Sequence, residues 1–197
     1  MNKPFSQSCE NNKTPILNVL SRYLTQPATL LEVGSGTGQH GVHMANHLPH
    51  ITWQTSDIDE NLAGIDLWRR EFQLDNLLKP IYFNVLEPES APSMHDHLFS
   101  ANTLHIMSWQ AVESFFKIIP SLMRKGGLAF FYGPFKYHGE YTSPNNADFD
   151  LWLKECATHQ GIRDFEAIEA LAYNAGLILL EDVSMPVNNQ TLVWKRG

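Results

Sequence analysis

Short apolar runs alternate along the chain with longer segments in which apolar residues recur every three or four positions. Runs rich in β-branched and aromatic residues predict strands, whereas the three-to-four-residue spacing predicts amphipathic helices. The predicted strands are 29–33, 51–56, 81–86, 97–104, 128–132, 177–183 and 190–195. The predicted helices are 15–24, 37–48, 61–74, 109–124, 147–158 and 165–174. Strands that alternate with helices indicate an α/β fold with a parallel sheet and helices on both faces.

The last two predicted strands are joined by a short segment, Met185 to Asn189. A connection of this length forces the two strands to run antiparallel to each other. We therefore expect a seven-stranded, mostly parallel sheet with an antiparallel last strand. No internal repeat and no long linker interrupts the pattern, so residues 1–197 predict a single domain.

Two segments fall outside the alternation of strands and helices. Residues 1–13 are polar and predict irregular structure. We expect the first helix to begin at Pro15, because proline suits the first helical turn, with Thr14 as its cap. Residues 135–146 are rich in polar, glycine and aromatic residues and predict a long functional loop.

A glycine turn joins the first strand to the helix that follows it. The apolar run Leu30–Val33 breaks into Gly34, Gly36 and Gly38, and glycine lets a ligand approach bare backbone. The helix that starts next presents unpaired N–H groups and a partial positive charge. A strand, a glycine turn and a helix N-terminus together predict a nucleotide site.

The spacing of the glycines distinguishes between two kinds of cofactor. The dinucleotide fingerprint requires glycine at position 39, but this residue is Gln39 and the third glycine is Gly38. Glu32 stands two residues before Gly34, and an acid followed by G-x-G-x-G resembles motif I of class I S-adenosylmethionine-dependent methyltransferases. This resemblance implies a Rossmann-like class I methyltransferase fold. The cofactor contacts expected around the turn are Glu32, Gly34, Ser35, Gly36, Gly38 and Gln39.

Acidic residues follow the second predicted strand. In open α/β sheets ligands bind beyond the carboxyl ends of the strands, where a carboxylate can accept hydrogen bonds from both ribose hydroxyls. Asp57 follows Gly34 by 57 − 34 = 23 residues, close to the roughly 20 that this arrangement prefers. Asp57 or Asp59 could instead cap the next helix. We assign Asp57 to the ribose, with Ile58 beside it.

The third and fourth predicted strands also end in candidate contacts. Class I methyltransferases usually carry an acid that meets the adenine amino group where this chain has Asn84, followed by Val85. The Asn84 amide oxygen can accept that hydrogen bond but carries no charge. Asn102 is expected to contact the cofactor or the acceptor, and a strand-end turn role is equally open. The Asn-Pro-Pro-Tyr stretch of methylases that act on nucleic-acid bases is absent.

Three side chains are candidates for the chemistry. Methyl transfer from a sulfonium needs mainly alignment and the exclusion of water, but an oxygen or protonated nitrogen acceptor also needs a base within reach. His105, at the end of the fourth predicted strand, is the leading candidate, followed by Tyr132 and His138. The alternatives are a backbone contact for His105, core packing for Tyr132 and a plain loop role for His138.

Charge and composition exclude several classes of partner. Asp and Glu number 21 against 14 Lys and Arg, giving a net charge of −7 with no basic run, so no nucleic-acid partner is expected. No apolar run has the roughly 20 residues of a membrane helix, and Cys9 and Cys156 suit a reducing compartment. We expect a cytoplasmic protein without a membrane partner. His40, His43 and His47 share a helical face but lack an acid or cysteine beside them, so no metal site is expected.

Motifs along nearly the whole chain together resemble the domain-of-unknown-function 938 family. They are Asn12–Leu17, Leu31–His40, Trp53–Asp57, Asn102, His105-Ile106, Tyr132–Phe135, Gly161–Asp164, Met185 and Asn188-Asn189. The resemblance implies a class I fold with the cofactor at Glu32, Gly34, Gly36, Gly38 and Asp57, and with residues 1–26 covering the site. The family commonly has an acid at the position of Asn84 and an arginine near Asn11, and both differ here.

We therefore predict an S-adenosyl-L-methionine-dependent methyltransferase that releases S-adenosyl-L-homocysteine. The expected partner is a small-molecule acceptor of unassigned identity, and the pattern gives no oligomeric state. One alternative is a protein that binds the cofactor or its product without catalysis. Another is a nicotinamide-dependent oxidoreductase, which Gly38 in place of a glycine at position 39 disfavours.

Overall fold

The computed structural model describes residues 3–197, in which strands and helices alternate along most of the chain. The helices are α1 (Gln7–Tyr23), α2 (Gln39–His47), α3 (Asp59–Phe72), α4 (Trp109–Leu122), α5 (Pro144–Cys156) and α6 (Phe165–Asn174). The first strands are β1 (Ala28–Val33), β2 (Ile51–Asp57), β3 (Ile81–Tyr82), β4 (His97–Ala101) and β5 (Leu128–Gly133). The later strands are β6 (Phe135–Tyr137), β7 (Glu140–Tyr141), β8 (Arg163–Asp164), β9 (Leu177–Met185) and β10 (Asn189–Arg196).

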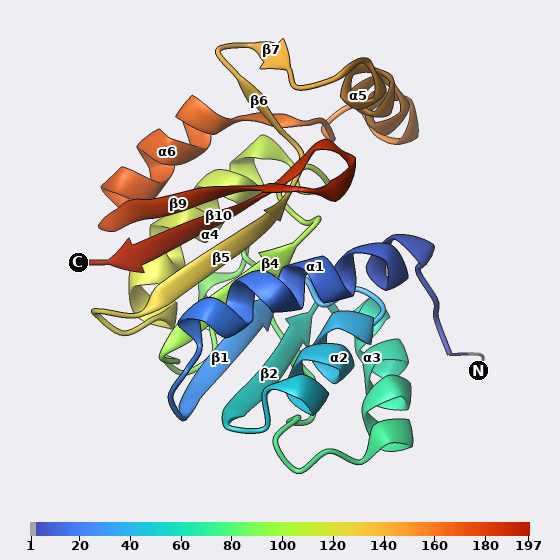
Figure 1. Ribbon diagram of the computed structural model, residues 1–197, viewed down its shortest axis with the longest axis vertical. Coiled ribbons are helices and arrows are strands. Elements are labelled where there is room, and N and C mark those ends of the chain that lie inside the picture. The colour runs from blue at the N-terminus through green and yellow to red at the C-terminus, as the bar shows by residue number, and fades with distance from the viewer. Residues whose placement is uncertain (1–2) are drawn as a thin grey trace.

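One large sheet organises the molecule (Figure 1). Its seven strands lie in the order β3-β2-β1-β4-β5-β10-β9. β10 runs antiparallel to both of its neighbours, while the pairs among β1 to β5 are parallel. The prediction of a seven-stranded, mostly parallel sheet with an antiparallel last strand is confirmed. The strand order reverses between β1 and β4, and such a switch point opens a crevice at the carboxyl ends of the strands.

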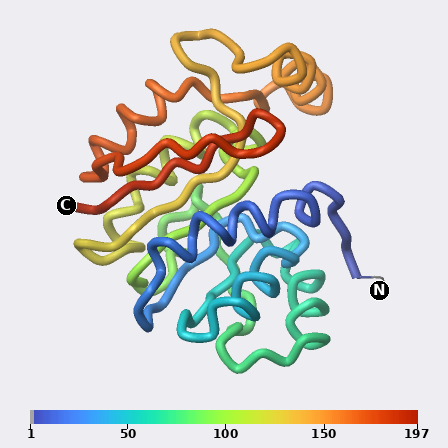
Figure 2. Tube along the Cα trace, viewed as in Figure 1, coloured from blue at the N-terminus to red at the C-terminus, as the bar shows by residue number. Residues whose placement is uncertain are grey.

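Helices cover both faces of the sheet, because successive strand residues point to opposite sides. Leu30 and Phe130 belong to the core cluster that packs under α1 and α2. Their neighbours Leu31 and Phe131 belong to the cluster under α4 and α6. In Figures 1 and 2, α1 to α3 lie on the near side of the sheet and α4 lies behind it. The expected placement of helices on both faces is confirmed, and each face has its own apolar core.

The first helix begins earlier than the sequence pattern predicted. α1 starts at Gln7, and its cap is Ser6, whose hydroxyl accepts from the Cys9 N–H at 3.3 Å. The prediction of irregular structure before a Thr14 cap is therefore wrong, and Pro15 lies inside the helix. Polar residues of the first turns extend the helix because they find hydrogen-bond partners at the start of α2, on Gln39 and His40.

Two strands end sooner than expected. β3 stops at Tyr82 rather than at residue 86, because the Asn84 amide oxygen accepts from the Leu86 N–H at 3.0 Å and turns the chain. β4 stops at Ala101 rather than at residue 104, because Asn102 takes a left-handed conformation with φ of 56°. Both turns lie at the carboxyl edge of the sheet.

The expected loop at 135–146 is partly ordered into strands. β6 and β7 pair with each other, and β8 joins them in a small sheet of order β7-β6-β8. α5 starts at Pro144 rather than at residue 147, since the Ser143 hydroxyl accepts from the Asn146 N–H. Within residues 3–197, none of the helices combines the length and apolar character needed to span a bilayer.

Candidate active site

A cavity of about 880 Å³ lies at the carboxyl edge of the large sheet. Its walls come from the glycine turn after β1, the ends of β2 and β4, the first turns of α1, and α5 with the turn between β9 and β10. The predicted site residues that line it are Gly34, Ser35, Gly36, Asp57, Ile58, Asn84, Val85, Asn102, His105 and Tyr132. The structure thus brings together candidates from five separate stretches of the chain.

The glycine turn needs glycine at the positions that face the cavity. Gly34 and Gly36 have φ values of 73° and 55°, in the left-handed region that other residues avoid. A Cβ on Gly34 would lie 2.6 Å from Cγ2 of Thr103, so the turn packs directly against the residues after β4. At Gly36 a Cβ would meet nothing within 4 Å, which leaves its backbone open to a ligand.

Asp57 lies at the tip of β2, directly beside the glycine turn. One carboxylate oxygen accepts from the Gly36 N–H at 2.6 Å. The other accepts from the Ile58 N–H at 2.8 Å and the Asn61 amide at 2.9 Å. Because a carboxylate oxygen can accept two hydrogen bonds, the oxygen bound to Gly36 keeps capacity for a ligand hydroxyl. The side chain is held rigidly and still borders the cavity.

Glu32, also predicted as a cofactor contact, lies beneath the turn and does not line the cavity. It is 1% exposed, and its carboxyl group accepts from the Trp53 indole N–H at 2.7 Å. Burial raises the pKa of Glu32 to about 8, because the charged form loses its hydration. The acid therefore ties β1 to β2. Gly38 also lies off the cavity, and a Cβ there would lie 3.0 Å from the Ile65 backbone of α3.

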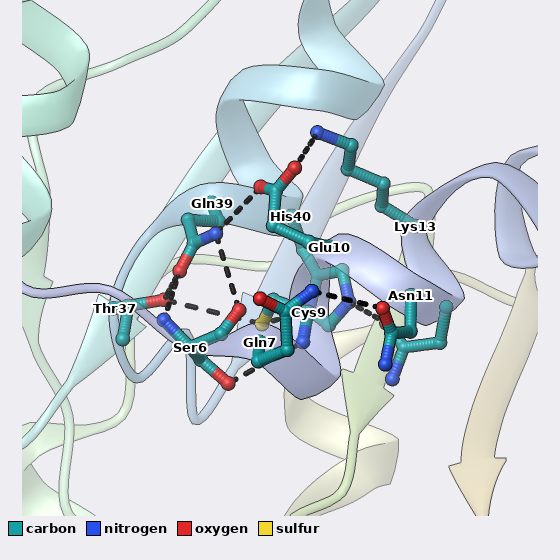
Figure 3. A network of polar contacts seen from close by, with 10 residues as sticks. Ser6, Gln7, Cys9, Glu10, Asn11, Lys13, Thr37, Gln39 and His40 are labelled. Carbon is teal, nitrogen blue, oxygen red and sulfur yellow. Dashed lines mark hydrogen bonds and ion pairs between the residues drawn. The ribbon is translucent and has the colours of Figure 1, made fainter.

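Gln39 holds α1 in place through a network of polar contacts (Figure 3). It does not line the cavity. Its amide oxygen accepts from the Ser6 N–H at 2.6 Å and from the Thr37 hydroxyl at 3.0 Å. Its amide nitrogen donates to the Glu10 carboxylate at 2.6 Å and to the Ser6 carbonyl at 3.3 Å. These bonds fix the first turns of α1 beside the glycine turn, where Ser8, Cys9, Asn11 and Asn12 line the cavity.

His40 extends the same contact between α1 and α2. Its Nε2 lies 2.7 Å from the Asn12 amide oxygen and its Nδ1 lies 3.6 Å from the Cys9 sulfur. Burial lowers the pKa of His40 to about 4, so the ring is neutral at physiological pH. His43 and His47 contact each other instead, with ring centroids 4.3 Å apart.

Asn84 and Asn102 line the cavity from the turns after β3 and β4. The Asn84 amide nitrogen donates to the Glu87 carboxylate at 3.0 Å, so its amide group is already engaged locally. Asn102 donates its backbone N–H to the Tyr132 carbonyl at 2.8 Å. Both expectations of a cofactor contact stay predictions, with the Asn84 oxygen retaining one free lone pair.

Two of the three chemical candidates line the cavity together. His105 is 5% exposed, and burial, followed by the nearby Arg163 charge, lowers its pKa to about 4. Burial raises the pKa of Tyr132 to about 12, although hydrogen bonds from Asn12 and Asn189 act in the opposite direction. At neutral pH the cavity therefore holds a neutral imidazole and a protonated phenol.

His138 is the candidate that the structure does not bring to the cavity. Its side chain is 86% exposed and its Nδ1 lies 3.2 Å from the Glu166 carboxylate. Its backbone takes a left-handed conformation with φ of 52°, in the turn between β6 and β7. We therefore leave His138 out of the chemistry proposed below.

Sequence reasoning missed the side chains that α5 contributes. Asn146, Phe149 and Trp152 line the cavity, and their spacing of three residues was the signal that they share a helix face. The pattern alone did not tell which neighbour that face meets. Residues 1–26 were expected to cover the site, but the α1 side chains that line the cavity were not identified, because their segment was predicted to be irregular.

Solved structures of methyltransferases share this fold. An O-methyltransferase family protein from Burkholderia thailandensis superposes with a TM-score of 0.83 at 17% identity, covering 96% of this chain and 57% of that one. The S-adenosylmethionine-dependent methyltransferase SibL superposes with a TM-score of 0.80 at 18% identity, over 96% and 56% of the two chains. CalO1, a methyltransferase in calicheamicin biosynthesis, solved with S-adenosylhomocysteine (SAH) bound, gives 0.73 at 17% identity, over 95% and 54%.

These likenesses establish the fold of the chain. The chain spans little more than half the length of each of these proteins. A sequence model of one protein family matches residues 3–196, which is nearly the whole chain. The chain therefore belongs to the family described as protein of unknown function DUF938.

Proposed function

We propose that this protein is an S-adenosyl-L-methionine-dependent methyltransferase that acts on a small molecule. The strongest support for this proposal is the position of the Asp57 carboxylate. The Asp57 carboxylate, held at 2.6 Å by the backbone of Gly36, faces an open cavity at the switch point of the sheet. An acid and a bare glycine turn at this position suit the ribose of a nucleoside cofactor.

The residues of the cavity fit this cofactor. Gly36 offers open backbone, Asp57 would accept from the ribose hydroxyls, and Ile58 with the turn after β3 would flank the adenine. The volume of about 880 Å³ lies near the upper end of the usual range for ligand sites, which is roughly 300–1,000 Å³. A small acceptor can therefore share the cavity with the cofactor. The SAH-bound CalO1 structure, which has the same fold, supports this choice of cofactor.

His105 is the residue proposed to handle the acceptor's proton. When bound, S-adenosyl-L-methionine would supply an electrophilic methyl group on its sulfonium, and the sulfur would keep the bonding electron pair as a neutral thioether. His105, neutral because its pKa is about 4, takes the proton that the acceptor loses as its bond to the methyl group forms. The same low pKa returns that proton to water afterwards. Tyr132, with a pKa of about 12, stays protonated and acts as a hydrogen-bond donor.

The proposal is tested by calorimetric titration with SAH. We expect Asp57→Asn to weaken binding about tenfold or more, because a charge-assisted hydrogen bond contributes roughly 1.5–3 kcal/mol and about 1.4 kcal/mol is tenfold. The matched control is Asp59→Asn, since Asp59 is exposed in the first turn of α3 and does not line the cavity. This control should bind SAH as the wild type does.

Two results would contradict the proposal. Equal SAH affinity in wild type and Asp57→Asn would remove Asp57 from the cofactor site. Tighter binding of a nicotinamide dinucleotide than of SAH would replace the methyltransferase function with the oxidoreductase alternative.

A further inference from the structure

The cavity has a second side, formed by α5, the turn between β9 and β10, and the residues after β4. α5 lies beyond the carboxyl ends of β4 and β5 (Figure 1). Asn146, Phe149 and Trp152 line the cavity there, and we call these three side chains the α5 face. The Asn146 amide donates to the Asn188 carbonyl at 3.0 Å, which fastens α5 to the turn between β9 and β10.

The lining of the cavity is almost free of charge. Among its described residues, Asp57 is the only acidic side chain, and none is lysine or arginine. The lining histidines, His40 and His105, are neutral because burial lowers their pKa values to about 4. The proposed function already assigns Asp57 to the ribose. The described lining residues supply no cation that would pair with an anionic acceptor, and an unpaired buried charge costs free energy, so the lining favours an uncharged acceptor.

The α5 face offers a flat aromatic surface. The rings of Phe149 and Trp152 stack with centroids 5.7 Å apart and 16° between their planes. Phe149 also meets the His105 ring edge-on at 5.6 Å. Trp152 is 54% exposed although it borders a cavity, so its indole ring is open to a further contact. Exposed aromatic rings of this kind bind flat aromatic molecules in offset-stacked or edge-on contacts.

His105 supplies a polar group beside this surface. Its side chain is 5% exposed and lines the cavity, and its ring nitrogens are not among the fully buried polar atoms that lack a partner within residues 3–197, so they are open to the cavity. A neutral imidazole has one nitrogen that accepts a hydrogen bond, so this position suits a ligand that donates one. A hydroxyl group on a molecule that lies against the α5 face would donate to the ring.

We propose that the methyl acceptor is an uncharged aromatic alcohol that stacks on the α5 face and donates its hydroxyl to His105. This inference rests on the proposed methyltransferase function. The residues that carry it differ from those that carry the cofactor proposal, so the two can fail separately.

Three probes of similar size test the acceptor class on SAH-saturated protein, with calorimetry as the readout. The probes are 2-naphthol, its anionic relative 6-hydroxy-2-naphthoate, and the saturated alcohol trans-2-decalol. We expect 2-naphthol to bind at least about tenfold more tightly than the other two. The anion lacks a counter-ion in the cavity and the saturated alcohol cannot stack.

Variants of α5 then test the aromatic surface. Trp152→Ala should weaken 2-naphthol binding about fivefold to tenfold, the size of one lost aromatic contact, while Trp152→Phe should retain most of the affinity. Leu151→Ala is the matched control, because Leu151 is 60% exposed on the same helix and does not line the cavity. SAH affinity and melting temperature should stay at wild-type values in all three variants.

Each negative result would overturn a different part of the proposals. If SAH binds but no probe does, or 6-hydroxy-2-naphthoate binds as tightly as 2-naphthol, the inferred acceptor class is overturned and the cofactor proposal stands. Unchanged 2-naphthol affinity in Trp152→Ala would overturn the role of the α5 face. Absence of SAH binding would overturn the proposed function and this inference with it.

Discussion

Glu32 is a buried acid whose protonation is linked to the stability of the fold. Its pKa is about 8 in the folded protein against 4.5 for an ordinary glutamate, because burial disfavours the charge. Between these two values the folded state keeps a proton that the unfolded state has lost. Stability therefore falls as the pH rises from about 4.5 to about 8, and this loss is complete above the folded pKa.

We expect Glu32→Gln to remove this loss, because glutamine can still accept from the Trp53 indole N–H and carries no titratable group. The measurement is the free energy of unfolding in urea at pH 5, 6.5 and 8. The difference between variant and wild type should shift in favour of the variant as the pH rises. Buried His40 and His105 change stability in the opposite direction, but only between about 4 and 6.5 and equally in both proteins. A difference that does not change with pH would contradict the buried, raised-pKa description of Glu32.

Single residues were predictable where local geometry alone dictates them. The three glycines were predictable because the turn itself takes left-handed conformations. Asp57 was predictable from its distance along the chain from the glycine turn, which suits a ribose-binding acid. The role of Glu32 was not predictable, because its partner Trp53 lies 21 positions away on the neighbouring strand. His138 was placed near the site by its chain position, whereas the turn between β6 and β7 carries it outward.

At the scale of elements, α1 is fastened over the cavity through Gln39. We expect Gln39→Ala to release the Ser6 backbone and the Glu10 side chain from α2, because the substitution removes the amide group and its four hydrogen bonds. Each such bond contributes about 0.5–1.5 kcal/mol, so amide hydrogen exchange in the first turns of α1 should accelerate on the order of tenfold or more.

Gln7→Ala provides the comparison for this experiment. The Gln7 side chain lies on the same part of α1 but is exposed, and within residues 3–197 it bonds only to Asn11 of its own helix. Exchange in Gln7→Ala should remain near the wild-type rate. Should Gln39→Ala protect α1 as well as wild type does, the attachment of α1 would have to come from its apolar contacts, such as Ile16 and Leu20.

Contacts with residues distant in the chain also explain why some element bounds were predicted and others were not. Elements with a strong internal period, such as α4 and β5, were predicted close to their observed bounds. The start of α1 was not, because Ser6 and the residues after it are polar, and a polar helix is stabilised here by its contacts with the glycine turn. β3 is cut short by side-chain bonds of Asn84, which period-based reasoning does not detect.

At the scale of the whole molecule, the cavity depends on segments that only the complete fold assembles. Its lining comes from several residues between Ser6 and Pro15, from the ends of β1, β2 and β4, and from the turn before β10. The two core clusters share the same strands, so the sheet cannot open on one face while the other stays intact. We therefore expect a single cooperative unfolding transition for residues 1–197, and two resolved transitions would contradict the single-domain prediction.

Because the site exists only in the folded state, SAH should stabilise the whole chain. At a concentration about 100 times its Kd, a ligand that binds only the folded state contributes about 2.7 kcal/mol. For a protein of this size that corresponds to a rise in Tm of about 5–11 °C. At the same SAH concentration, Asp57→Asn with about tenfold weaker binding should show about half of this rise. Differential scanning calorimetry with and without SAH measures both shifts, and Asp59→Asn should match the wild type. A wild-type Tm that does not move under saturating SAH would mean that the ligand does not bind the folded cavity described here.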